Sequence, residues 1–189
     1  MAPRLLRRDP GARAIYLNLR PEPYLATLLA GPNSPTDLRG HGPERMRRLL
    51  RTLAPASLPP LHDLSLGELA AMSWLAETLT QHELLDAAPD RVLAVDFDAL
   101  LADVPHVLSQ VASHLSLAVP AGWAAQLGSH PALTRYSKSP DHEYSPALRA
   151  QVLAQARREH AGELRRGIAW LENVARAEPA AARVLQAAA

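Results

Sequence analysis

The sequence predicts a helix-rich α/β fold with a small parallel sheet, of which two strands are visible. The apolar segments at 14–19 and 91–97 are rich in residues that favour strands. They stand about seventy residues apart, and apolar residues between and after them repeat with helical spacing. Because a parallel pair needs a long crossover connection, usually a helix, we expect these two strands to pair in parallel.

Composition and charge exclude several classes of function. The formal net charge of +1 gives no general attraction to nucleic acid or to a membrane surface. The chain has no cysteine, which excludes disulfides, thiolate metal sites and a cysteine nucleophile. No apolar run reaches the length of about 18 residues that a transmembrane helix needs, and the basic start lacks the apolar core of a signal peptide. We expect a soluble cytoplasmic protein that binds neither nucleic acid nor a membrane.

The stretch at 12–30 organises the chain, because it combines a strand, a turn and a helix. Arg20 and Pro21 end the strand, and Pro23 suits the first turn of the helix that follows. Anions often bind where the helix of such a βα unit begins. Arg20 is therefore the strongest single candidate for a binding residue, and the alternative is a surface arginine that closes a turn.

Two helices are predicted between this unit and a proline-rich linker. Ser34 can cap a short helix whose first residue is Pro35. Leucine and methionine at helical spacing predict a second helix over 43–53. Five arginines fall within residues 39–51. They form either a solvated face or a surface that binds an anion, since a guanidinium group offers phosphate or sulfate a planar fork of donors.

A long helix follows the linker, and its start has the capping-box pattern of Ser65 and Glu68. Trp74 lies roughly opposite the apolar stripe of this helix, because successive residues are rotated by about 100°. The helix is therefore expected to bury two sides, between the sheet and another layer or against a partner. The stripe is formed by Leu69, Met72, Ala76 and Leu79.

The second strand is expected to be buried on both faces, because residues 92–95 are continuously apolar. Asp98 can cap a short turn that runs through Leu101. At the end of a strand, Asp96 and Asp98 can instead hold a metal-bound water or a substrate. The eight histidines lack the spacing of metal ligands, so we predict no metal site.

The C-terminal part of the chain is predicted to be mostly helical. A helix is expected over 105–117, a short one begins at Pro120, and a polar loop covers 128–144. Ser145 then caps a helix that continues to Arg176, a length of about 45 Å at 1.5 Å per residue.

A single domain is expected over residues 1–178. The remaining residues, 179–189, form an Ala-rich tail with little reason to be ordered. Two motifs of known chemistry are absent from the sequence, the Gly-x-Ser-x-Gly elbow of hydrolases and the Gly-x-x-x-x-Gly-Lys-[ST] phosphate loop. Lys138 is the only lysine, so we do not expect a phosphate site that is built from lysine side chains.

Two segments resemble the sulfotransferase family. Residues 12–29 look like the segment in which a strand ends in arginine, a proline-containing turn follows and the helix carries a serine. The sequence RVLAVDFDALLAD at 91–103 is similar to a later strand of that family, which ends in an aromatic-acid-x-Leu signature, here at 97–100. Residues 104–117 match the next helix of the family. The resemblance covers roughly residues 12–30 and 91–117.

The resemblance implies part of a three-layer α/β fold of the P-loop type. It also implies that 3′-phosphoadenosine 5′-phosphosulfate (PAPS) is the cofactor, an anionic small-molecule donor, and that a hydroxyl or amine accepts its sulfuryl group. In that family the arginine and the serine bind the 3′-phosphate, so Arg20 and Thr27 are the implied cofactor-binding residues. Thr27 stands seven residues after Arg20, one short of the common spacing, and the match requires a one-residue deletion in the turn. No catalytic residue and no metal are implied.

Three parts of the family pattern have no counterpart here: the phosphosulfate-binding loop, the usual catalytic base and the later Arg-Lys-Gly loop. We therefore expect the central and C-terminal half of a sulfotransferase-like domain, incomplete at its N-terminal side and inactive as this chain. A sheet of only two strands agrees with an absent half. The alternative is a non-catalytic helical interaction or dimerisation module, which can form a homodimer.

Overall fold

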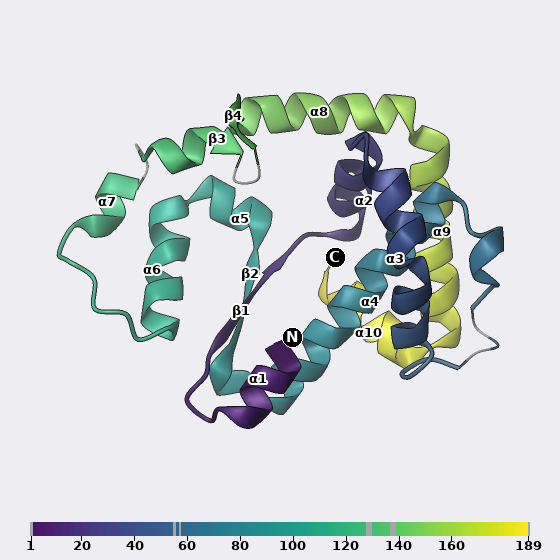
Figure 1. Ribbon diagram of the computed structural model, residues 1–189, viewed down its shortest axis with the longest axis horizontal. Helices are drawn as coiled ribbons and strands as arrows, with labels where there is room; N and C mark the ends of the chain where they lie inside the picture. The colour runs from purple at the N-terminus through teal and green to yellow at the C-terminus, as the bar shows by residue number, and fades with distance from the viewer. Residues whose placement is uncertain (1, 55, 57, 128–129, 137–138, 189) are drawn as a thin grey trace. The chain divides into compact units, whose positions relative to one another are not determined.

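The computed structural model describes residues 2–54, 56, 58–127, 130–136 and 139–188 (Figure 1). The chain divides into two compact units. Unit 1 consists of Met1–Asn18 and Glu83–Arg149, and unit 2 consists of Leu19–His82 and Ala150–Ala189. Within the described residues, no helix combines the length and the apolar character that crossing a bilayer requires.

Unit 1 contains the parallel pair of strands that the sequence predicts. β1 covers Ala14–Asn18 and β2 covers Val92–Asp96, and Figure 1 shows the two running side by side. The register pairs the strands residue by residue, from Ala14 opposite Val92 to Asn18 opposite Asp96. Helices together with this small sheet make a mixed α/β chain, so the coarse fold class is confirmed.

β2 is not buried on both faces, and that expectation is wrong. Val92 and Val95 are buried, whereas Leu93 is half-buried and Ala94 is exposed. A sheet of two strands offers little area for other elements to cover. The apolar run therefore indicated a strand correctly but did not indicate its burial.

α1 (Ala2–Arg8) is attached to the start of β2 by Arg91. The Arg91 guanidinium group donates hydrogen bonds to the carbonyl oxygens of Leu6, Asp9 and Pro10, each at 3.1 Å. Carbonyl groups at the end of a helix have no partner within the helix. One arginine thus satisfies several carbonyls at and after the end of α1.

Asp96, and not Asp98, caps the helix after β2. α5 covers Phe97–Ala102, and the Asp96 carboxylate accepts a hydrogen bond from the Ala99 amide at 2.7 Å. Asp98 lies in the first turn of α5 and forms an ion pair with Arg149 at 2.9 Å. The predicted cap at Asp98 is wrong because the helix begins two residues earlier than the prediction required.

α6 covers Val104–His114, where the sequence predicts a helix over 105–117, and α7 covers Trp123–Leu127, where it predicts a helix that begins at Pro120. The end of α6 is set by Ser116, whose φ of 55° lies in the left-handed region. The amide of Leu117 bonds back to the carbonyl oxygen of Ala112 at 2.9 Å. This is the Schellman arrangement, which terminates a helix and satisfies its last carbonyls.

The segment predicted as a polar loop contains a short antiparallel pair. β3 covers Arg135–Tyr136 and β4 covers Ser139–Glu143. The loop prediction is wrong for these residues, because main-chain pairing needs no apolar alternation that a sequence pattern can reveal. Residues 128–129 and 137–138, including the only lysine, Lys138, lie outside the described residues.

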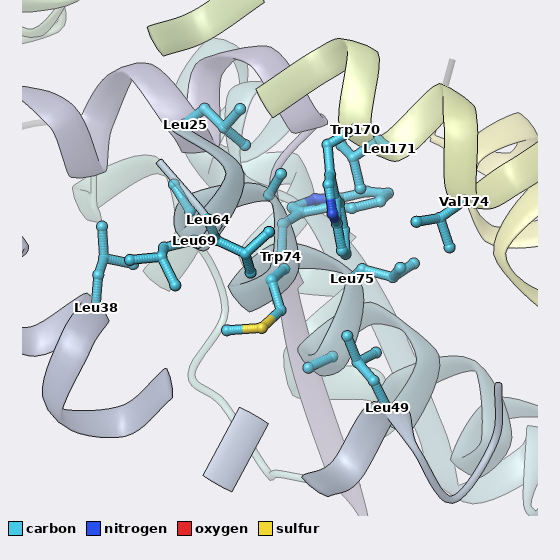
Figure 2. Close-up of a cluster of buried hydrophobic side chains, with 14 of the residues drawn as sticks. Leu25, Leu38, Leu49, Leu64, Leu69, Trp74, Leu75, Trp170, Leu171 and Val174 are labelled. Atoms are coloured by element: carbon cyan, nitrogen blue, oxygen red, sulfur yellow. The ribbon is translucent and has the colours of Figure 1, made fainter. Parts of the chain in front are cut away.

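Unit 2 is helical and has one apolar core. It contains all or part of α2 (Pro21–Ala30), α3 (Ser34–Leu49), α4 (Leu66–Ala87), α8 (Pro146–Glu159), α9 (Ala161–Ala177) and α10 (Pro179–Ala187). Figure 2 shows that apolar side chains from several of these helices point toward one another in the core. Those labelled there are Leu25, Leu38, Leu49, Leu64, Leu69, Trp74, Leu75, Trp170, Leu171 and Val174.

α4 begins with the predicted capping box and is buried on two sides. The Glu68 carboxylate accepts a hydrogen bond from the Ser65 amide at 2.7 Å, and the Ser65 hydroxyl accepts one from the Glu68 amide at 3.3 Å. Every residue from 69 to 76 is buried. This run includes Trp74, so the prediction that α4 buries two sides is confirmed.

α3 is one helix, where the sequence predicted two. It runs from Ser34 through Pro43, and Ser34 is its first residue and not its cap. Pro43 lacks the N–H that would bond the carbonyl of Arg39. Both residues are exposed, so water can satisfy that carbonyl and the helix continues. Leu53 lies beyond the end of α3 but is still buried.

The prediction of one long C-terminal helix is also wrong, because the helix is interrupted at His160. The φ and ψ of His160 are −112° and 24°, outside the helical region, and they separate α8 from α9. The expected unordered tail at 179–189 is wrong as well, because α10 covers most of it. Ala181 and Val184 of α10 are fully buried in the core of unit 2.

Candidate functional site

Arg20 stands where the predicted turn becomes a helix. It is the N-cap of α2, with φ and ψ of −59° and 154°, and its side chain is exposed. The preceding carbonyl, that of Leu19, accepts a hydrogen bond from the indole N–H of Trp74 at 2.9 Å. The Arg20 carbonyl oxygen accepts from the Tyr24 amide at 3.2 Å, the first bond of the helix. A buried tryptophan of α4 therefore fixes the backbone that carries Arg20.

The start of α2 has few backbone donors for an anion. Among its first three residues only Glu22 carries an N–H, because Pro21 and Pro23 have none. Glu22 itself places a negative charge near the positive end of the helix dipole. The side chain of Arg20, and not the helix start, must therefore supply most of the attraction for an anionic ligand.

A cavity of about 380 Å³ lies beside the start of α2, within unit 2. Four of its lining side chains are charged, two arginines and two glutamates, so their formal charges cancel. The apolar part of the lining comes mainly from α9 and α10. The lining residues are Arg20, Pro21, Glu22, Pro23, Arg157, Ile168, Leu171, Glu172, Leu185 and Ala188.

Arg157 of α8 and Glu22 of α2 form a two-point ion pair at this cavity. Arg157 Nε lies 2.7 Å from Glu22 Oε1, and Arg157 Nη2 lies 2.8 Å from Glu22 Oε2. The hydrogen bond with Arg157 lowers the pKa of Glu22, burial opposes this, and the charges of Arg157 and Arg20 lower the pKa further. Glu22 therefore stays ionised between the two arginines.

Thr27 is not among the residues that line the cavity. It is exposed on α2, and its hydroxyl donates a hydrogen bond to the Pro23 carbonyl oxygen at 2.7 Å. Seven residues correspond to almost two turns, so Thr27 lies on nearly the same side of α2 as Arg20, about 10 Å further along the axis. Because phosphate oxygens accept hydrogen bonds, Thr27 has to release Pro23 before it can donate to a phosphate. Its joint role with Arg20 stays a prediction.

The arginines of α3 are largely engaged with carboxylates. Arg48 Nη2 lies 2.5 Å from Glu77 Oε1, and Arg45 Nη2 lies 3.2 Å from Asp37 Oδ2. Arg47 is also paired, with a carboxylate one turn before it on the same helix. These pairs favour the interpretation of a solvated, locally neutralised face over that of an anion-binding surface.

The two aspartates at the end of β2 serve the local structure. Asp96 caps α5, and Asp98 pairs with Arg149, whose guanidinium carbon lies 5.1 Å from the centre of the Phe97 ring. Within the described residues, no three His, Asp or Glu side chains are placed to share a metal ion. The geometry of these aspartates is therefore explained without a ligand.

Sequence reasoning identified Arg20 but missed Arg157, Glu22 and Glu172. The Arg157–Glu22 pair joins residues 135 positions apart, so no local pattern could indicate it. Leu185 was missed because its segment was predicted as a tail. Comparisons of the chain with protein-family models, with curated proteins and with solved structures found no match.

Proposed function

We propose that the chain is a sulfotransferase-like cytoplasmic protein whose Arg20 binds the 3′-phosphate of PAPS, and that it does not transfer the sulfuryl group as this chain alone. In this proposal the chain is part of a three-layer α/β domain of the P-loop type. The observation that carries the proposal is the position of Arg20, which is the N-cap of α2, two residues after β1 ends at Asn18, and which lines the cavity.

The chemistry of the cavity supports a ligand of this kind. A guanidinium group binds phosphate through two parallel N–H donors, which a lysine cannot do. A volume of about 380 Å³ falls within the range of small-molecule sites. The apolar lining from Ile168, Leu171 and Leu185 offers a surface for the purine ring. Parallel pairing of β1 with β2 also brings together the two strands on which the family resemblance depends.

Transfer itself requires parts that the resemblance does not find here. The acceptor oxygen has to lie in line with the sulfuryl group, and donors have to stabilise the charge on the bridging oxygen. We assign neither a base nor an oxyanion donor to any residue. With one arginine supplying most of the contacts, we expect nucleotide binding in the millimolar range, which corresponds to about −4 kcal/mol.

Calorimetric titration with adenosine 3′,5′-bisphosphate tests the proposal. We expect weak binding by the wild-type chain, a loss of at least about tenfold in Arg20→Ala, and partial recovery in Arg20→Lys, which keeps the charge but not the fork. Arg39→Ala is the matched control, because Arg39 is exposed on α3 and does not line the cavity. Equal affinity in R20A and R39A contradicts the proposal.

The second candidate function is a non-catalytic interaction or dimerisation module. It is favoured by exposed apolar side chains in unit 1, where Leu5, Leu17 and Leu117 are 54%, 51% and 56% exposed. Association would remove these side chains from water. Size-exclusion chromatography with light scattering tests it: a homodimer that Leu17→Asp converts to a monomer supports this function, and a monomer at all concentrations contradicts it.

A further inference from the structure

The Arg157–Glu22 pair has the geometry with which an arginine holds an external anion. Two nitrogens of one guanidinium group, Nε and Nη2, each contact a different oxygen of the same carboxylate, at 2.7 and 2.8 Å. A phosphate group presents oxygens at a similar separation and is bound by arginine in the same way. The carboxylate therefore occupies the position that a phosphate would take on Arg157.

Arg20 acts on the same carboxylate. Arg20 and Arg157 both line the cavity, and the charge of each lowers the pKa of Glu22. A phosphate that contacts either arginine while Glu22 remains in place would meet a like charge. Binding of an anion at this cavity and retention of the Arg157–Glu22 pair therefore oppose one another.

Water can reach both members of the Arg157–Glu22 pair. The side chains of Arg157 and Glu22 are 46% and 40% exposed, so water can solvate the carboxylate once it leaves the arginine. Most exposed ion pairs contribute little to stability, but a two-point arginine–carboxylate pair is the geometry in which such a pair does contribute. A ligand with two or more negative charges can compete for Arg157 because it replaces both hydrogen bonds to the guanidinium group while Glu22 regains water.

We propose that Arg157 is a second anion-binding residue of the cavity and that Glu22 is a built-in competitor that occupies it in the absence of ligand. The ligand class is an organic phosphate, with its phosphate on Arg157 and its apolar body against Ile168 and Leu185. This inference rests on the proposed function for the assignment of an anion to the cavity. It extends that function to two residues that the family resemblance does not name.

The test is a titration of the full chain with phenyl phosphate and with inorganic phosphate, followed by chemical shifts of backbone amides. In Glu22→Gln the affinity for both probes is expected to rise about tenfold, because Arg157 is freed to form a charged hydrogen-bond pair with the phosphate. In Arg157→Ala the affinity is expected to fall about tenfold, because that pair is lost. Phenyl phosphate is expected to bind more tightly than inorganic phosphate, because only its ring can contact the apolar lining. Arg157→Lys is a second variant, which keeps the charge and the long side chain but not the planar fork of donors. It shows whether a loss of affinity in R157A comes from the lost fork or from disturbed packing of α8.

Glu172→Gln is the matched control, because it removes the same charge from the same cavity while leaving the carboxylate of Glu22 on Arg157. A rise in affinity in E22Q that clearly exceeds the rise in E172Q supports direct competition. The inference is overturned if E22Q and E172Q have equal effects, or if affinity is unchanged in both R157A and R157K. The proposed function is decided separately, by the nucleotide titration of R20A. If R20A does not alter nucleotide affinity but E22Q and R157A behave as expected, the proposed function fails and the competitor role of Glu22 stands.

Discussion

Gly67 of α4 and Gly167 of α9 bring two helix backbones into direct contact. A Cβ atom added to Gly167 would lie 2.5 Å from the Gly67 carbonyl oxygen and 2.5 Å from Leu25 Cδ2. A Cβ atom added to Gly67 would overlap the carbonyl group of Glu163. The amide of Gly67 also donates a hydrogen bond to Glu163 Oε2 at 2.7 Å. This crossing sets the distance between α4, whose Trp74 fixes the backbone before Arg20, and α9, which lines the cavity.

Alanine at this crossing is predicted to destabilise the protein. Gly167→Ala must push apart two backbones that cannot relax as a flexible side chain would, and we expect a loss of about 1–3 kcal/mol in the free energy of unfolding. Gly40→Ala is the control, because Gly40 lies on α3 and, apart from its chain neighbours and the nearby backbone of its own helix, no described atom lies within 4 Å of the added Cβ. That change should stabilise the helix by about 0.5–1 kcal/mol. Urea unfolding measures both, and a neutral Gly167→Ala contradicts the close contact.

Removal of the Trp74 hydrogen bond is predicted to loosen the turn before α2. Trp74→Phe keeps an aromatic ring in the core but leaves the Leu19 carbonyl without its donor, at a cost of about 1–2 kcal/mol. Trp170→Phe is the matched control, because the Trp170 indole nitrogen is buried and has no hydrogen-bond partner in the described structure. The W170F variant should lose less stability. Thermal unfolding followed by circular dichroism compares the two, and an equal loss in both variants speaks against a specific role for the Trp74 donor.

Arg91 is predicted to hold α1 in place. Arg91 Nη1 contacts the carbonyl oxygens of Leu6, Asp9 and Pro10, and Nη2 also contacts that of Leu6; a lysine has no second nitrogen with which to hold this arrangement. In Arg91→Lys, amide hydrogen exchange should therefore become faster in α1 than in the rest of unit 1. Arg7→Ala, which removes an exposed arginine of α1 itself, should leave the exchange rates unchanged. Unaltered protection of α1 in R91K contradicts this role.

Glu163 is predicted to make unit 2 sensitive to acid. Burial raises the pKa of Glu163, but hydrogen bonds from the Gly67 amide, Arg166 and Ser65 outweigh burial and lower it below 4.5. Because the pKa is lower in the folded state, the ionised carboxylate stabilises the fold above pH 4.5, and this contribution is lost as the pH falls through the folded-state pKa. Glu163→Gln should show a shallower loss of stability below pH 4.5 than the wild type, measured by urea unfolding across pH. Parallel curves for the two proteins contradict the prediction.

Local signals predicted the elements of the chain better than their lengths. The capping box at Ser65 and the cap at Ser145 are confirmed, because each depends on residues three positions apart; the Ser145 hydroxyl accepts from the Leu148 amide at 3.0 Å. The break at His160 carries no such signal, since neither proline nor a capping pattern marks it. The unordered tail was predicted from its alanines, yet small side chains are what allow α10 to pack closely on α9.

The candidate site was only partly predictable for the same physical reason. Arg20 could be identified because a strand, a proline turn and a helix are contiguous in the sequence. Its cavity could not, because Arg157 and Leu185 come from helices more than a hundred residues away and join it only through packing. Glu22 is only two residues from Arg20, but its role as a competing carboxylate could not be predicted without knowing that its partner is Arg157.

We expect an anionic nucleotide to bind at the start of α2 through Arg20. The most direct measurement maps amide chemical shifts while adenosine 3′,5′-bisphosphate is added to the wild-type chain. We predict that the largest changes fall on Arg20, on Glu22 and on the cavity-lining residues of α9, and that they vanish in Arg20→Ala. Changes centred instead on the arginines of α3, or changes that persist unaltered in R20A, would contradict the account.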